Sequence, residues 1–165
     1  MKSKRIFLKG LGLSASTAWI TPLVTSVVMP AHAQTTIVIT AAPPKLYSIG
    51  DTGPCGGKVF EISNGGLNGK EAAPANLPGT YTWVAAINSA SSYMNGGCSD
   101  WYLPNKAELN TLYINKDNIG GILSYVYWSS TPLGSFTAWL QFFGNGLQDF
   151  NNRGLNYRVR AIRAF

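Results

Sequence analysis

Histidine is nearly absent from this sequence, in which His32 is the only example. Histidine is the most frequent general base in enzymes and the commonest metal ligand. If the segment around His32 is cleaved off, serine–histidine–aspartate triads, cysteine–histidine pairs and histidine-ligated zinc sites are all excluded. The scarcity of histidine therefore argues against the familiar classes of hydrolase and zinc enzyme.

Acidic residues are scarce as well, and none precedes Asp51. The start of the chain carries positive charge only, on Lys2, Lys4, Arg5 and Lys9. An apolar stretch over 10–29 follows and leads to Ala31-His32-Ala33, the small-x-small pattern of a signal-peptidase site. We therefore expect residues 1–33 to be a signal peptide. A membrane anchor is the alternative, but the serines and threonines within the stretch do not suit a span of about 20 apolar residues.

The first residues also indicate an export route. Ser3-Lys4-Arg5-Ile6-Phe7-Leu8-Lys9 resembles the twin-arginine pattern S-R-R-x-F-L-K, with Lys4 in place of the first arginine. Proteins exported by that route cross the membrane already folded. Residues 34–46 are predicted to be a tether, and residues 47–165 the folded domain. The periplasm, the cell surface and the medium all remain open as destinations.

The basic character of the chain belongs largely to the predicted signal peptide. Four of the thirteen basic residues lie within 1–33, so the remaining 132 residues carry nine basic and seven acidic side chains, a net charge of +2. A chain of that length can form one domain with its own core. Nucleic-acid binding is not expected, because it requires a strongly basic face. No membrane span is expected once the signal is removed.

Only two cysteines occur, Cys55 and Cys98. An even number of cysteines in an oxidising compartment favours a disulfide, and closing a loop of this length contributes about 3–4 kcal/mol. Two free thiols or a thiolate metal site are the alternatives. The sequence predicts the disulfide, and it predicts no cofactor and no metal. Asp117-Asn118 supplies two adjacent oxygen ligands, whereas calcium requires about six to eight.

The distribution of apolar and turn-forming residues predicts an α+β domain. A helix is predicted over 82–94, with Trp83, Ile87, Ala90 and Met94 on its buried side. A second helix is predicted to begin at Asn105, where Asn105 and Glu108 have the spacing of a capping box. Residues 64–79 are predicted to be an irregular surface loop. Strands are predicted over 47–49, 58–62, 125–130, 136–143, 147–150 and 157–164.

Five ordered motifs in the predicted domain resemble the Lcl C-terminal domain family, which is named from a bacterial collagen-like adhesin. The resemblance extends from about residue 47 to residue 165. It implies a C-type-lectin-like fold used as a binding module on exported bacterial proteins, and its namesake binds sulfated polysaccharide. The motifs are Ile49-Gly50-Asp51-Thr52-Gly53-Pro54, Asp100-Trp101-Tyr102-Leu103-Pro104 with 105–109, Tyr127-Trp128-Ser129-Ser130, Ala138-Trp139, and Arg158-Val159-Arg160-Ala161-Ile162-Arg163-Ala164-Phe165.

The C-terminal segment also resembles the variable proteins of diversity-generating retroelements, in which a reverse transcriptase rewrites adenines in a repeat. Residues 138–158 correspond to such a repeat. The resemblance implies that nine positions, where the template would carry asparagine, differ between copies. They are Leu140, Phe142, Gly144, Leu147, Asp149, Phe150, Gly154, Leu155 and Tyr157.

The strand predicted over 138–143 has large apolar residues on both faces, because alternate side chains project to opposite sides. If Trp139 and Phe143 face the core, Leu140 and Phe142 form an exposed apolar patch of the kind that marks an interaction site. The alternative is a strand buried on both sides. Trp83, Trp101 and Trp128 are expected in the core. The predicted ligand-binding residues are Leu140, Phe142, Gly144, Leu147, Asp149, Phe150, Asn151, Asn152, Gly154, Leu155, Asn156 and Tyr157.

Three arginines near the end of the chain allow two interpretations. Arg158, Arg160 and Arg163 form an anion-binding strip, or at least one of them is half-buried and paired with a carboxylate. Side chains alternate along a strand, so Arg158 and Arg160 are expected on the same side as the apolar Ile162. That side is expected to be partly buried, which favours the second interpretation.

These observations lead to one main prediction and two competing ones. The main prediction is a non-enzymatic binding module whose partner is an unknown protein or carbohydrate at the cell surface, sulfated polysaccharide included. A secreted hydrolase that uses a carboxylate pair is the first competitor. A purely structural surface protein is the second. The carboxylates available to the hydrolase are Glu61, Glu71, Asp100, Glu108 and Asp149.

Overall fold

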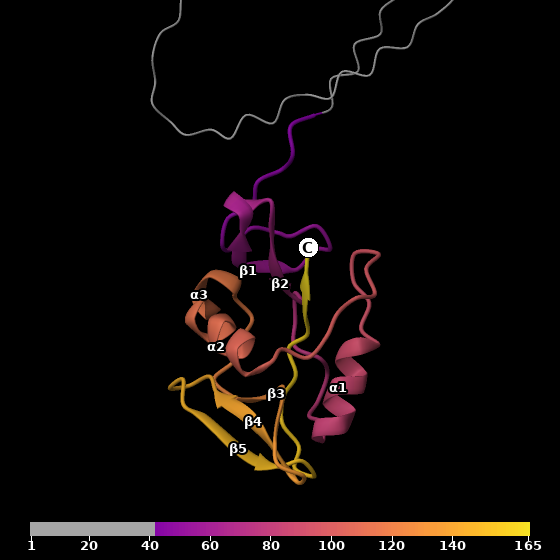
Figure 1. Cartoon of the computed structure of the whole chain (residues 1–165), viewed down its shortest axis with the longest axis vertical. Coiled ribbons are helices and arrows are strands. Elements are labelled where there is room, and N and C mark those ends of the chain that lie inside the picture. Colours follow the sequence, from indigo (N-terminus) through magenta and orange to yellow (C-terminus); the bar gives the residue numbers. More distant parts are fainter. Residues whose placement is uncertain (1–41) are drawn as a thin grey trace, which may run out of the picture. The chain divides into compact units, whose positions relative to one another are not determined.

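The computed structural model describes residues 42–165 and shows an α+β domain, as predicted, whose strands form two antiparallel sheets (Figure 1). The predicted signal peptide, and the predicted tether up to residue 41, lie outside the described residues. No helix within the described part of the chain has the length and apolar character needed to cross a membrane. The elements are β1 (Lys58–Ser63), η1 (Asn64–Gly66), β2 (Asn68–Ala72), α1 (Trp83–Ser91), α2 (Lys106–Ile114), α3 (Lys116–Ile119), β3 (Val126–Leu133), β4 (Thr137–Phe142), β5 (Gln148–Asn152) and β6 (Ile162–Ala164).

The first sheet has the strand order β1–β2–β6, so the end of the chain returns to pair with its beginning. Strand β2 lies inside the segment predicted to be an irregular loop, and that prediction is wrong over 68–72. The sequence Asn-Gly-Lys-Glu-Ala has little intrinsic strand preference, and pairing with β1 and β6 on its two sides overrides it. The predicted strand over 47–49 is also wrong, since these residues belong to no strand.

The second sheet is the meander β3–β4–β5. Gly146 closes the turn between β4 and β5 with a φ of 81°, as the Gly-Asn-Gly sequence predicts. A Cβ at Gly146 would also collide with the Tyr113 ring of α2. The turn therefore requires glycine both for its backbone and for its contact with the helix.

The two longer helices pack on different parts of this framework. Helix α2 touches β3 and β4 of the second sheet and β1 of the first, whereas α1 touches β3. Figure 1 shows α1 and α2 on opposite sides of the C-terminal segment. The capping box of α2 is confirmed, because Asn105 accepts from the backbone amide of Glu108 while Glu108 accepts from that of Asn105. Helix α1 is shorter than predicted, and Met94 lies beyond it and is exposed.

The core consists of two clusters of buried side chains. Trp101 and Trp128 are buried in the first, together with Ala86 and Ala90 of α1, whereas Trp83 only packs against its edge. Leu109 and Leu112 of α2 pack with Phe60, Tyr127 and Phe143 in the second. The core prediction is therefore confirmed for two of the three tryptophans.

The Cys55–Cys98 disulfide is confirmed, with Cα atoms 6.0 Å apart. It joins the glycine-rich turn before β1 to the loop after α1. A Cβ at Gly53 or Gly57 in that turn would collide with the Glu71 carboxylate. The turn is rich in glycine because its backbone closes tightly around this side chain.

Candidate functional site

The residues predicted to bind ligand divide between the two faces of the second sheet. Leu140 of β4 pairs with Asp149 of β5, so their side chains project from the same face. Trp139 pairs with Phe150, and this pair projects from the opposite face. No single face therefore carries the whole predicted set.

The prediction that Leu140 is exposed is wrong, because its side chain is only 2% exposed. Leu140 lies beside Trp128 on β3, and both belong to the first core cluster. Trp139, which was expected in the core, is instead half-buried. Strand β4 is the central strand and is covered on both faces, which is the alternative that the sequence left open.

The other predicted residues are accessible to different degrees. Phe142, Asn151 and Tyr157 are half-buried, and the remaining eight are exposed. The accessible part of the surface therefore comes from the turn after β4, from β5, and from the loop that follows β5. The exposed eight are Gly144, Leu147, Asp149, Phe150, Asn152, Gly154, Leu155 and Asn156.

Tyr157 is a half-buried residue of this set that contacts both the core and β5. Its ring lies edge-on to Trp128, with ring centroids 4.8 Å apart. Its hydroxyl accepts a hydrogen bond from the Asn151 side chain at 2.9 Å. Its backbone bonds in both directions with Tyr81. Tyr157 is thus held rigidly between the core and solvent.

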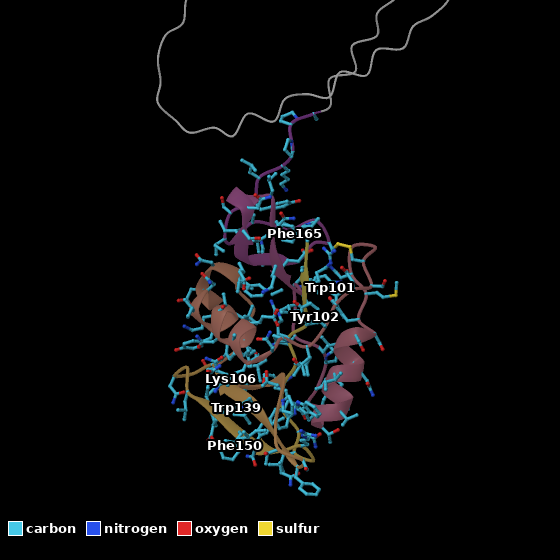
Figure 2. The ribbon with its side chains drawn as sticks, in the orientation of Figure 1. Trp101, Tyr102, Lys106, Trp139, Phe150 and Phe165 are labelled. Atoms are coloured by element: carbon cyan, nitrogen blue, oxygen red, sulfur yellow. A yellow bond between two sulfur atoms is a disulfide. The ribbon has the colours of Figure 1, made fainter. Side chains whose placement is uncertain are left out.

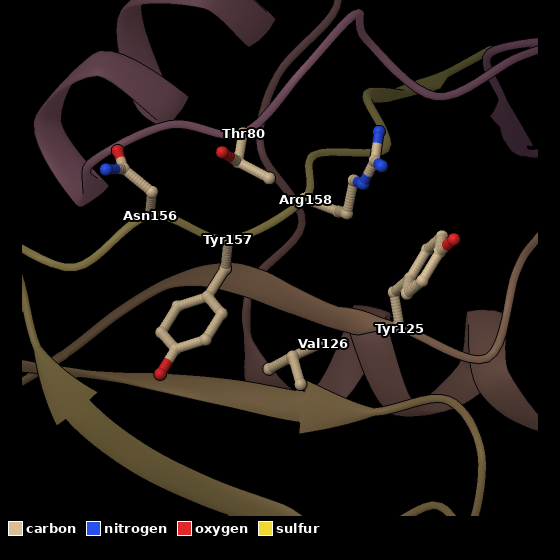
Figure 3. A pocket seen from close by; sticks show the side chains of 6 residues that line it. All are labelled: Thr80, Tyr125, Val126, Asn156, Tyr157 and Arg158. Carbon is tan, nitrogen blue, oxygen red and sulfur yellow. The ribbon is translucent and has the colours of Figure 1, made fainter.

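A pocket of about 270 Å³ opens beside Tyr157 (Figure 3). Its apolar part is formed by Tyr125, Val126 and Tyr157, and no acidic residue lines it. Figure 3 shows the two tyrosine rings on either side of Val126, with Arg158 beside Tyr125. The lining residues are Thr80, Tyr125, Val126, Asn156, Tyr157 and Arg158.

Asn156 and Tyr157 were predicted as site residues, and Arg158 was considered for an anion-binding strip. Thr80, Tyr125 and Val126 were missed. They join the pocket because Arg158 pairs with β3 in a parallel bridge next to Val126, and because Tyr81 pairs with Tyr157. Both contacts join segments distant in sequence, and no local pattern indicates them.

Trp139 and Phe150 form an aromatic pair on the face opposite to Leu140 and Asp149, and Figure 2 shows them close to Lys106. The Lys106 ammonium lies 3.0 Å from the centre of the Trp139 ring, and Phe150 meets that ring edge-on at 5.9 Å. Lys106 thus covers part of the Trp139 ring, while Phe150 is 48% exposed. Phe150 is the more accessible aromatic side chain of the pair.

Four of the five carboxylates proposed for a hydrolase are ion-paired near the first sheet. Lys70 lies 2.8 Å from Glu61 and 3.3 Å from Glu108. Burial alone would lower the pKa of Lys70, but its bonds to these two carboxylates outweigh that effect and raise the pKa. Burial and the bond to Glu108 likewise raise the pKa of Tyr102 well above its usual value.

Glu71 and Asp100 share Arg163 in the same way. The Arg163 guanidinium lies 2.8 Å from Glu71 and 2.7 Å from Asp100. Hydrogen bonds from Arg163 hold the pKa of Asp100 below its usual value. Glu71 is fully buried and also accepts hydrogen bonds from the backbone amides of Cys55 and Gly57. The fifth carboxylate, Asp149, accepts from the amide of Phe150.

The interpretation that at least one of the three arginines is half-buried and paired with a carboxylate is confirmed, although the alternation argument pointed to Arg158 or Arg160 rather than to Arg163. Arg160 is buried, yet its partners are neutral oxygens of Asn76, Pro74, Gly120 and Gly121. Burial lowers the pKa of Arg160 to about 10. The arginine paired with carboxylates is Arg163, because β6 turns that side chain toward Glu71 of its neighbour β2.

A model of a known protein family, the Lcl C-terminal domain, matches residues 64–163. No curated protein matches the chain. The matched range begins at η1, directly after β1, and ends within β6, so it includes the whole second sheet, the three α-helices and the pocket, and the first sheet without β1.

Proposed function

The chain belongs to the Lcl C-terminal domain family, and from that membership we propose that it is an exported, non-enzymatic ligand-binding module with a C-type-lectin-like fold. Its ligand surface is formed by Leu147, by β5, by the loop over 153–156, and by Tyr157. The observation that carries the proposal is the exposure of Leu147, Phe150 and Leu155 between polar residues on a well-packed sheet. Apolar side chains within a polar rim are typical of binding surfaces.

Export is supported by two independent features. Residues 1–33 have the charge, apolar stretch and small-x-small ending of a signal peptide. The Cys55–Cys98 disulfide suits an oxidising compartment. We propose the periplasm, the cell surface or the medium as the location, and a protein or carbohydrate at the cell surface as the partner.

The carboxylate contacts support binding rather than hydrolysis. General acid–base catalysis requires carboxylates that can exchange protons with a substrate. Glu61, Glu71, Asp100 and Glu108 are all bound to Lys70 or Arg163, and none of them lines the pocket.

We further propose that the surface is diversified by a retroelement. Of the nine positions suggested to vary, Leu140 is buried, whereas Leu147, Asp149, Phe150 and Leu155 are among the six that are exposed. The test is the DNA downstream of the gene. We expect a near-copy of the codons for residues 138–165, which differs from them at adenines and lies beside a reverse transcriptase gene. The absence of any such copy from the genome would contradict diversification.

The binding proposal is tested by screening the purified exported protein against arrays of proteins and glycans, sulfated polysaccharides included. A variant with Phe150→Asn and Leu155→Asn should lose a ligand that the parent binds. Ile62→Asn is the matched control, because Ile62 is 43% exposed on the first sheet, away from the proposed surface. Equal loss of binding in the control variant would show that the surface is elsewhere.

A further inference from the structure

We propose that the pocket beside Tyr157 binds a carboxylate group carried on an apolar or aromatic body about the size of one amino-acid side chain. The inference rests on the proposed binding function and names the ligand class of one part of that surface. Two sources share this chemistry: a free organic acid and the C-terminal residue of a polypeptide.

The walls of the pocket determine the apolar half of the ligand. The pocket is open to solvent on one side, and two tyrosine rings and Val126 form most of its lining, so a polar group placed against them would lose water contacts without replacement. The volume of about 270 Å³ equals that of about nine water molecules. This is room for one aromatic or branched side chain, and not for a long polymer segment.

Arg158 determines the charged half of the ligand. Its guanidinium lies over the Tyr125 ring, 4.9 Å from the ring centre, and one nitrogen donates to the carbonyl of Gly79 at 3.3 Å. That bond uses one of five guanidinium N–H donors. Arg158 forms no ion pair with any carboxylate of residues 42–165, in contrast to Arg163. Arg158 therefore places a cation at the rim of the pocket, beside Tyr125, with donors free for the charged end of a ligand whose apolar body lies in the pocket.

The arrangement favours a carboxylate among the possible anions. Among the residues of 42–165 that line the pocket, Arg158 alone is charged, so it balances one negative charge. A planar guanidinium matches the two oxygens of a carboxylate in a bidentate pair. Thr80 and Asn156 are exposed at the pocket and offer neutral hydrogen-bonding groups to the rest of the ligand.

The test is an NMR titration of the purified protein with N-acetylphenylalanine and with its amide, which differ only in the charged group. The acid should shift the backbone amide signals of Val126, Tyr157 and Arg158 and should bind about tenfold more tightly than the amide. Arg158→Gln should abolish this difference, and Arg158→Lys should retain part of it. Lys58→Gln, which removes one positive charge from β1 of the first sheet, should leave it unchanged.

Two further probes distinguish the sources. Tighter binding of a peptide with a free C-terminal phenylalanine than of phenylacetate identifies a polypeptide terminus, and the reverse order identifies a free acid. Equal binding of acid and amide, an acid preference that persists in Arg158→Gln, or stronger binding of a sulfated monosaccharide would each overturn the inference. One of those results can occur while the double variant Phe150→Asn, Leu155→Asn still loses binding to a ligand found on the arrays. In that case the proposed function stands and only the carboxylate ligand class fails.

Discussion

Four charged residues of the first sheet, Glu61, Lys70, Glu71 and Arg163, are each joined to an opposite charge, whereas Lys58 at the start of β1 bonds the Thr52 hydroxyl. Around the second sheet, Lys106, Arg153 and Arg158 form no ion pair within residues 42–165 and instead lie over the aromatic rings of Trp139, Trp83 and Tyr125. The same residue types thus stabilise the fold in one region and remain available to a ligand in the other.

The two regions differ in their exposed side chains as well. Strand β2 of the first sheet buries Glu71 and Ala72 between its two neighbours. Strand β5 is the edge of the second sheet, and none of its five side chains is fully buried. We infer that the first sheet is part of the framework and that the exposed edge of the second presents the binding surface, so substitutions on β5 and its flanking loops should affect stability less than substitutions of buried residues in the first sheet.

The largest effect is expected for Glu71→Gln. Glu71 is fully buried and accepts hydrogen bonds from Arg163 and from two backbone amides. Breaking a buried ion pair lowers the free energy of unfolding by roughly 3–5 kcal/mol. Urea denaturation monitored by tryptophan fluorescence measures the free energy of unfolding. A loss below about 1 kcal/mol would mean that the charge network does not support the framework.

A smaller effect is expected when the disulfide is removed. It joins residues 43 positions apart, and chain-entropy arguments with typical measurements give about 2–4 kcal/mol for such a bridge. The Cys55→Ala, Cys98→Ala double variant should therefore melt at a lower temperature than the parent. Binding by the second sheet should survive below the new melting temperature, and its loss there would contradict the division between the two regions.

A still smaller effect concerns acid stability. Because Arg163 lowers the pKa of Asp100 in the folded protein, the stabilisation is fully present above the usual value of 3.8 and is lost as the pH falls through the lower, folded pKa. Asp100→Asn should reduce stability at neutral pH and flatten the loss of stability below pH 3.8. Unfolding curves at several pH values between neutral and strongly acidic check this. An unchanged acid profile in the variant would show that the pair with Arg163 contributes nothing.

Local features of the fold were predictable from the sequence. The capping box at Asn105, the glycine turn at Gly146 and the disulfide follow from short patterns or from counting. Strand β2 was not predictable, because its residues form a strand only through partners on both sides. Helix α3 was missed because four residues give too little periodicity to detect.

The exposure of the predicted site residues could be inferred from the sequence only in part. Strand β4 has large apolar residues on both faces, so alternation could not decide which face was covered. The structure covers both, which buries Leu140 and leaves Trp139 half-buried. Thr80 and Tyr125 reach the pocket only through pairing between distant segments.

The central claim is that the exposed residues of β5 and its flanking loops serve a ligand rather than the fold. It is tested most directly by comparing Leu140→Asn with a triple variant, Leu147→Asn, Phe150→Asn and Leu155→Asn, by chemical denaturation. The triple variant should lose at most about 1.5 kcal/mol, since exposed substitutions usually change stability by less than about 0.5 kcal/mol each. Leu140→Asn should lose about 3 kcal/mol or more, because it leaves a cavity and buries an amide. If the triple variant unfolds as readily as Leu140→Asn, these side chains belong to the core and the account of the binding surface is wrong.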